Sequence, residues 1–330
     1  MTTQNKPVPA RPAPPQVQRC ILVTGASGGI GRATVVRLAD AGHLVFAAAR
    51  RAEELQALAA THPGIRPVAL DITDPAAIDH ARDQITDQTS GNGLDVVINA
   101  AGTLILGPVE AVSDQRTRAQ FEVNLFGTLA VTRAFLPPMR DRGQGRIVNV
   151  SSILGRFALP GSGIYAASKF ALEAASDAMR IELAPFGVRI VLVEPGVIAT
   201  ALYARAAAAL PDDQALGPYR ATWPAGFGFP DRLLQAAASV DTIAATLTEA
   251  ALAARPRPRY RPGLRNRLNT RLLTTLPTGS ADRIKRRIVG VASSARPTPP
   301  SPDGAALTQP RRSTNQESAD AKGHICEPLR

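Results

Sequence analysis

Residues 20–31 read CILVTGASGGIG, and this stretch decides the fold. The apolar run 21–23 predicts a buried strand, and Gly25, Gly29 and Gly31 then lead into a helix. Glycines at such a turn let the backbone approach a phosphate group closely, and the helix N-terminus presents free N–H groups to it. The stretch therefore predicts a phosphate-binding turn, although a plain tight turn between a strand and a helix has the same pattern.

Short apolar runs alternate with longer helical patterns beyond this turn. Continuous apolar strands that alternate with helices predict a parallel sheet covered on both faces. We therefore expect one α/β domain over residues 19–262, a doubly wound Rossmann-type fold with a mainly parallel sheet. The later strands are expected at 43–49, 67–70, 94–99, 146–151 and 188–193, and long helices at 113–139 and 163–185.

Composition sets the limits of this domain. The chain has 330 residues, of which 28 are proline, and a formal net charge of +11. Residues 1–18 and 292–330 are Pro-rich or polar without periodicity, so we expect disordered tails. The two cysteines, Cys20 and Cys326, predict neither a disulfide framework nor a metal site. No secretory signal and no apolar run long enough to span a membrane is visible, which predicts a cytoplasmic protein.

Most of the positive charge lies in one segment. Residues 255–288 contain eleven Lys and Arg against one acid, Asp282, so they carry +10 of the net +11. Leucines and isoleucines recur there every four or five residues, which suggests an amphipathic helical extension over 263–291. Such a helix can lie on the inner face of an anionic membrane, or it can pack on the sheet domain with a solvated outer face. Nucleic-acid binding is not expected, because Tyr260 is the one aromatic residue among these arginines and no series of aromatic residues alternates with them.

Three side chains together predict proton-transfer chemistry. Tyr165 and Lys169 are four residues apart, so on a helix both project from one face. A neighbouring ammonium lowers the pKa of a tyrosine, and Tyr165 can then exchange a proton with a carbonyl or alcohol as hydride moves. Ser152 would hold the substrate oxygen, and Lys169 could also hold the nicotinamide ribose.

The end of the second expected strand bears on the cofactor. An acid there would accept hydrogen bonds from the adenosine ribose, but this chain has Ala49 followed by Arg50 and Arg51. Two guanidinium groups can bind a 2′-phosphate, so NADP is favoured over NAD; the alternative is two solvated arginines at the start of a helix. Asp71, after the third strand, fits either a contact with adenine or a turn.

Taken together, these motifs resemble the short-chain dehydrogenase/reductase family over residues 20–262. The family's cofactor turn matches residues 24–31, and its Asn-Asn-Ala-Gly segment matches residues 99–102 with Ala100 in place of one Asn. The resemblance implies that Asn124, Ser152, Tyr165 and Lys169 are catalytic, with Asn124 holding a relay water, and that the protein is a homodimer or homotetramer. The expected cofactor-binding residues are Gly25, Ser27, Gly28, Gly29, Ile30, Gly31, Arg50, Arg51, Asp71, Asn99, Ala100, Gly102, Tyr165, Lys169, Pro195, Gly196, Val197 and Thr200.

Residues 197–232 break the alternation of strands and helices and contain five of the fourteen aromatic residues. They fit an apolar lid over a hydrophobic substrate, or a long loop with a small core of its own. The expected substrate-binding residues are Ser152, Leu154, Phe157, Tyr165, Tyr203 and Trp223. Oxidoreduction of a steroid-, retinoid- or lipid-like alcohol or carbonyl is the leading hypothesis. Reduction of a β-ketoacyl thioester and a non-catalytic binding or regulatory role are the alternatives; the complete catalytic set argues against the latter.

Overall fold

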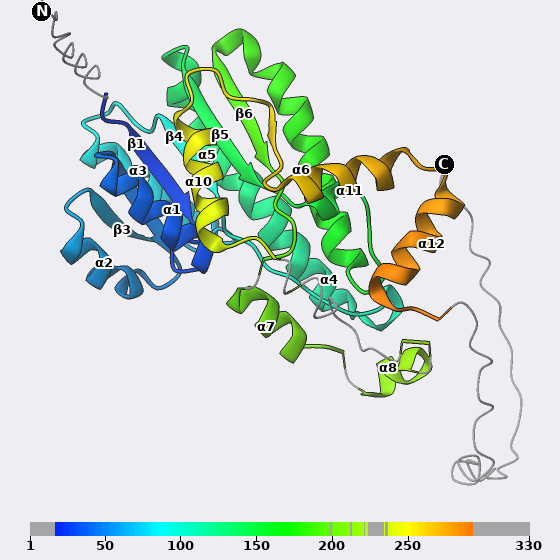
Figure 1. Cartoon of the computed structure of the whole chain (residues 1–330). Coiled ribbons are helices and arrows are strands. Elements are labelled where there is room, and N and C mark those ends of the chain that lie inside the picture. Colours follow the sequence, from blue (N-terminus) through cyan, green and yellow to red (C-terminus); the bar gives the residue numbers. More distant parts are fainter. Residues whose placement is uncertain are drawn as a thin grey trace, which may run out of the picture. The chain divides into compact units, whose positions relative to one another are not determined.

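The parallel strands of the sheet place the predicted motifs together at their carboxyl ends. The structure, a computed structural model, describes residues 17–198, 200–211, 213–220, 222–223, 234 and 237–292. Its seven strands are all parallel, in the order β3-β2-β1-β4-β5-β6-β7 (Figure 1). The order reverses direction between β1 and β4, which is the point where doubly wound sheets bind ligands. The strands are β1 (Cys20–Thr24), β2 (Leu44–Ala49), β3 (Ile65–Ala69), β4 (Val96–Asn99), β5 (Gly145–Val150), β6 (Val188–Val193) and β7 (Arg259–Tyr260).

Helices cover both faces of this sheet. Alternate strand residues such as Val23 and Ile98 pack with α1, α2 and α10, whereas Leu22 and Val97 pack with α3 and α5 on the opposite face. This two-sided burial explains why the strands are continuous apolar runs, and it confirms the predicted doubly wound α/β fold. The helices that precede the extension are α1 (Gly29–Asp40), α2 (Gln56–Thr61), α3 (Pro75–Gln88), α4 (Asp114–Phe121), α5 (Thr128–Asp141), α6 (Gly163–Glu182), α7 (Ala201–Ala208), α8 (Asp213–Arg220) and α10 (Val240–Leu252).

The long helix expected at 113–139 is interrupted by a π-helical turn. Residues Glu122–Gly127 form this turn between α4 and α5, and it contains the buried Asn124. π-Helical turns are rare and occur often at functional sites, because they aim one side chain differently from its neighbours. The sequence pattern gives no signal for this interruption.

The basic extension forms two helices after a short edge strand. β7 pairs with β6 through Leu192 and Val193, and α11 (Leu264–Thr275) and α12 (Thr278–Val289) follow it. Pro277 separates the two helices, so the extension is not one continuous amphipathic helix. Leu273 and Val289 pack against Leu154 and Phe157 of the sheet domain, which places the extension over the carboxyl end of the sheet.

Three groups of expectations fall on residues about which nothing is described. The predicted tails, except residues 17, 18 and 292, lie outside the described ranges. Residues 224–233 of the predicted lid, with Phe227 and Phe229, also lie outside them. The described parts of the lid form α7 and α8.

Candidate active site

The turn between β1 and α1 requires glycine at two positions. Gly25 has φ +68°, and a Cβ on it would lie 2.8 Å from the backbone of Ala101. A Cβ on Gly31 would lie 2.2 Å from the carbonyl oxygen of Gly25. No side chain caps α1 at Gly28, so its first N–H groups stay available to a ligand. This cradle fits the pyrophosphate of a dinucleotide.

Thr24 fixes the neighbouring strand end. Its hydroxyl oxygen accepts hydrogen bonds from the backbone N–H groups of Ala100 and Ala101, both at 3.1 Å. These bonds hold the segment after β4 against the glycine turn. Thr24 is therefore a positioning residue. It belongs to the motif of residues 24–31, but the sequence alone indicated no role for its side chain.

Arg50 and Arg51 differ in their surroundings. Arg51 forms an exposed ion pair with Glu54, whereas no carboxylate in the described ranges pairs with Arg50. Asp71 accepts hydrogen bonds from the backbone N–H of Thr73 (2.9 Å) and from its hydroxyl (2.7 Å). The backbone bond is the largest effect that lowers the pKa of Asp71, and the charge of Arg50 adds to it. Asp71 thus forms a turn within reach of the Arg50 charge.

Asn99 directs its side chain into the sheet. Its amide donates to Asn149 Oδ1 (2.9 Å) and Thr132 Oγ1 (3.1 Å), and the amide of Asn149 donates to Ser176 Oγ (2.9 Å). All four side chains are buried. This ladder ties β4 and β5 to α5 and α6, and it occupies the amide of the Asn99 side chain within the buried interior.

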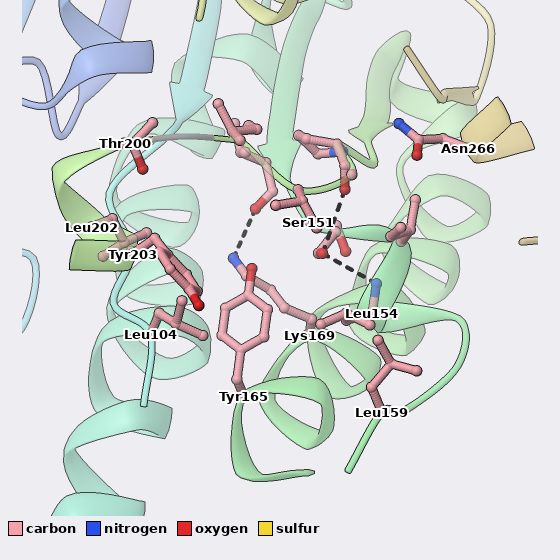
Figure 2. A pocket seen from close by; sticks show the side chains of 18 of the residues that line it. Leu104, Ser151, Leu154, Leu159, Tyr165, Lys169, Thr200, Leu202, Tyr203 and Asn266 are labelled. Atoms are coloured by element: carbon pink, nitrogen blue, oxygen red, sulfur yellow. Dashed lines mark hydrogen bonds between the residues drawn. The ribbon is translucent and has the colours of Figure 1, made fainter. Parts of the chain in front are cut away.

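Tyr165 and Lys169 project from α6 toward the carboxyl ends of the strands (Figure 2). Lys169 Nζ lies 5.9 Å from the centre of the Tyr165 ring and donates to the carbonyl of Val150 at 2.9 Å. Burial lowers the pKa of Lys169 to about 8, and the charge of Glu173 partly opposes this. Burial raises the pKa of Tyr165 to about 12, and a hydrogen bond with Ser152 opposes it in part.

The expected lowering of the Tyr165 pKa is therefore wrong for the protein without ligand. Burial of the phenol favours its neutral form, and burial also disfavours the charge on Lys169 that was expected to stabilise the phenolate. Tyr165 is a neutral phenol at neutral pH.

Ser152 and Asn124 complete the predicted catalytic set. The Ser152 hydroxyl accepts a hydrogen bond from the N–H of Leu154 (3.1 Å) and lies 3.5 Å from the carbonyl oxygen of Pro195. The Asn124 amide donates to Ser168 Oγ and to the carbonyl of Thr103, both at 3.0 Å. A Cβ on Gly102 would lie 3.4 Å from Asn124 Oδ1 and 3.9 Å from Lys169 Nζ. Asn124 and Lys169 thus flank Gly102.

One pocket of about 210 Å³ joins the catalytic residues to the cofactor turn. Leu154, Phe157 and Tyr203, which are three of the residues expected to bind substrate, line this pocket. Of its described lining residues, none is Asp or Glu. The predicted cofactor residues on the wall are Ile30, Ala100, Gly102, Tyr165, Lys169, Pro195, Gly196, Val197 and Thr200.

Trp223 differs from its prediction. Its indole N–H donates to the carbonyl of Val289 at 3.0 Å, and its ring lies against Gly161. The side chain is 5% exposed and packs beside the pocket wall without lining it. Trp223 therefore holds α12 in place behind the pocket.

The extension contributes a wall that motif analysis missed. Asn266, Asn269 and Leu273 of α11 line the pocket, and Figure 2 shows Asn266 on the side opposite Leu202 and Tyr203 of α7. The Asn266 amide lies so close to Gly196 that a Cβ on Gly196 would be 2.5 Å from it. Their spacing of three and four residues on α11 was the available signal, but no sequence pattern indicated which element that face meets.

A family model described as short chain dehydrogenase matches residues 19–210, more than half of the chain. This chain belongs to the short-chain dehydrogenase family. The match confirms the resemblance drawn from the motifs, and it ends before α10, β7 and the two extension helices.

Curated relatives align with this chain over more than half of their own length. "Uncharacterized oxidoreductase YbbO" of Escherichia coli K12 is 39% identical over 56% of this chain and 67% of that protein. "3-Ketodihydrosphingosine reductase" of Bacteroides thetaiotaomicron is 36% identical over 53% and 62%. "NADPH-dependent 3-dehydrocapnine reductase" of Ornithobacterium rhinotracheale is 31% identical over 73% and 87%.

Solved structures resemble the chain over a larger part. A short-chain dehydrogenase from Streptomyces avermitilis is 31% identical with a TM-score of 0.66, covering 83% of this chain and 96% of that one. A short chain dehydrogenase from Burkholderia cenocepacia J2315, solved in complex with NADP, is 29% identical with a TM-score of 0.63, covering 81% and 97%. The fold of this chain is thus that of its family.

Proposed function

We propose that this oxidoreductase reduces the carbonyl group of a hydrophobic, lipid-like substrate with NADPH, or oxidises the corresponding alcohol. The observation that carries the proposal is the placement of Ser152, Tyr165 and Lys169 on the wall of one pocket whose described lining has no carboxylate. Such a pocket suits an apolar molecule with one polar reacting group.

The proton chemistry follows from the ionisation of the side chains. Tyr165, with a pKa of about 12, holds its proton at neutral pH and donates it to the carbonyl oxygen during reduction. Ser152 donates a hydrogen bond to the same oxygen and orients it. Lys169, as the ammonium, stabilises the phenolate that remains, and Asn124 lies beside it for return of a proton from solvent.

The nicotinamide cofactor, when bound, supplies or accepts the hydride. The glycine turn at Gly25 and Gly31 would hold its pyrophosphate, and Arg50 would hold the 2′-phosphate of NADP. The relative named as NADPH-dependent and the neighbour solved with NADP support NADP over NAD.

The substrate class rests on the shape of the pocket and on the named relatives. Two relatives are named as reductases of 3-ketodihydrosphingosine and 3-dehydrocapnine, which points to a long-chain ketone. Asn266, Asn269 and Arg265 add a polar patch to the otherwise apolar pocket. An amphiphile with a polar end group and an apolar chain fits this wall. The same geometry also serves a β-ketoacyl thioester, which is the second candidate.

We also propose that α11 contacts anionic membranes, where such substrates reside. Leu264, Leu268 and Leu272 form a stripe with exposures of 70%, 60% and 47%. Arginines flank the stripe, as in helices that lie in a membrane interface. No helix in the described ranges is long and apolar enough to cross a membrane.

For self-association we propose the surfaces of α4, α5 and α6. Phe126, in the π-helical turn between α4 and α5, and Phe170, on α6, are exposed there.

The test is a panel of long-chain 3-ketones, steroids, retinoids and acetoacetyl thioesters with NADPH and NADH. We expect NADPH-dependent reduction of a long-chain ketone, and a loss of roughly 10²–10⁴-fold in kcat for Tyr165→Phe. Tyr219→Phe is the control, because the Tyr219 hydroxyl donates to Glu110 outside the pocket. A preference for NADH, for thioesters, or full activity in Tyr165→Phe would contradict the respective part of the proposal.

A further inference from the structure

A second cavity lies beside α11, away from the catalytic residues. It has a volume of about 390 Å³ and is lined by Thr270, Thr274 and six arginines: Arg156, Arg257, Arg259, Arg261, Arg267 and Arg271. None of these residues lines the catalytic pocket. Arg267, Thr270 and Arg271 are spaced by three and four residues, so they share one face of α11. Asn266, Asn269 and Leu273 share a neighbouring face, and that face lines the catalytic pocket.

Four of the six arginines pair with acids, of which only Glu173 and Glu194 are buried. Arg259 binds Glu173, Asp177 and Glu194, and Arg261 also binds Glu194. Arg257 pairs with Glu249, and Arg156 lies 4.0 Å from Glu173. These pairs hold β7 and its neighbours on α6 and β6. Arg156, Arg257 and Arg261 also line the cavity, so these paired arginines surround the two that follow.

Arg267 and Arg271 lack such partners. Among the described residues no carboxylate forms an ion pair with either of them, so they leave a net charge of about +2 at the cavity. Arg267 uses its Nε to donate to the carbonyl of Arg261 at 2.9 Å, which directs its guanidinium group along the wall. Like charges this close repel one another, and a bound anion would relieve the repulsion.

A buried hydroxyl gives an independent indication. Thr270 is 1% exposed and lines the cavity, yet its hydroxyl has no hydrogen-bond partner among the described residues. Leaving a buried hydroxyl without a hydrogen-bond partner is unfavourable. A ligand oxygen at the cavity floor would supply the missing partner.

We propose that this cavity binds a phosphate monoester or diphosphate group. Guanidinium groups match the oxygens of phosphate bidentately, and two uncompensated positive charges match a dianion. The site is separate from the proposed cofactor site, because Arg50 follows β2 and the cavity lies at β7, near the opposite edge of the sheet. The phosphate group belongs to a soluble metabolite or to a lipid headgroup, and the experiment distinguishes the two.

The test measures inorganic pyrophosphate binding to the full chain by titration calorimetry at low salt. With NADPH occupying the glycine turn we expect one saturable site, weakened at least tenfold in Arg267→Gln/Arg271→Gln and unchanged in the control Arg283→Gln/Arg286→Gln on α12. All four arginines are exposed, so the variants should fold, and circular dichroism checks this. NADPH at saturation should leave the pyrophosphate affinity unchanged.

A second arm uses vesicles that contain phosphatidic acid, which presents a phosphate monoester. Vesicle binding that depends on Arg267 and Arg271 and is competed by pyrophosphate assigns the site to a lipid headgroup. If pyrophosphate binds but vesicle binding does not depend on Arg267 and Arg271, the site is assigned to a soluble ligand. Absence of saturable pyrophosphate binding, equal losses in both double variants, or displacement by NADPH would overturn the proposal.

Discussion

Lys169 shows how burial prepares the site at the level of a single residue. Its ammonium donates a hydrogen bond to the carbonyl of Val150, and burial lowers its pKa to about 8. The shift from the ordinary value of 10.5 corresponds to roughly 3 kcal/mol of lost preference for the charged form. The protein therefore keeps a lysine that changes its charge just above neutral pH.

This pKa predicts how activity depends on pH. Since Lys169 assists the proposed reduction as an ammonium, kcat/KM for NADPH should fall above about pH 8, approaching tenfold per pH unit. Tyr165, with its higher pKa of about 12, stays protonated over this range and does not contribute. A pH profile from 6 to 10 measures the break.

The matched variant is Lys169→Arg, whose guanidinium group stays charged throughout this range. Its residual activity should show no break near pH 8. A flat wild-type profile, or the same break in the variant, would exclude Lys169 as its origin.

Residue roles were predictable where spacing alone fixes them. Tyr165 and Lys169 face one pocket because α6 is regular, and Gly25 and Gly31 stand where a Cβ has no room. The Tyr165 pKa was not predictable, because desolvation depends on every element that covers the site. The positions of Trp223 and Asn266 depend on where the extension packs, which local pattern does not encode.

Among the elements, β7 depends most on side chains for its attachment. It is two residues long and pairs only with β6, yet Arg259 connects it to Glu173 and Asp177 on α6 and to Glu194 after β6. Burial and the charge of Glu194 raise the pKa of Glu173, while Arg259 opposes this. A Pro-Arg run carries no strand signal, so β7 was not expected, whereas the six apolar strands were.

Removing this arginine should destabilise the protein strongly. Arg259→Met leaves the buried Glu173 and Glu194 with less compensation, which we expect to lower the free energy of unfolding by about 3–5 kcal/mol. Urea denaturation followed by circular dichroism measures the change. Arg257→Met is the control, because its pair with Glu249 is exposed and should be worth about 1 kcal/mol or less. Equal effects of both variants would show that Arg259 is not the attachment.

Charge is distributed unevenly over the whole molecule. Residues 255–288 carry +10 of the net +11, but Arg257, Arg259 and Arg261 are held by acids of the sheet domain. Apart from Arg255, the remaining cations lie on α11 and α12, and α11 also carries the exposed leucine stripe. Sequence analysis located the charge and the apolar spacing, but only the fold separates the neutralised arginines from the others.

This distribution predicts binding to anionic vesicles. Wild-type protein should sediment with phosphatidylglycerol vesicles at low salt, and Leu264→Gln/Leu268→Gln/Leu272→Gln should weaken this at least tenfold, because three apolar side chains no longer enter the interface. Ile181→Gln/Phe186→Gln, which alters exposed apolar residues elsewhere, is the control. No sedimentation of the wild type, or equal loss in the control, would refute the membrane proposal.

The wall that α11 places against Gly196 has an evolutionary consequence. Every reacting side chain precedes residue 200, whereas Asn266, Asn269 and Leu273 come after the final strand. Exchanging the residues after Pro262 would therefore replace this wall of the chamber, while the reacting side chains and the apolar wall of Leu154, Phe157 and Tyr203 would stay in place. Part of what selects the bound molecule is thus encoded apart from the groups proposed to react with it.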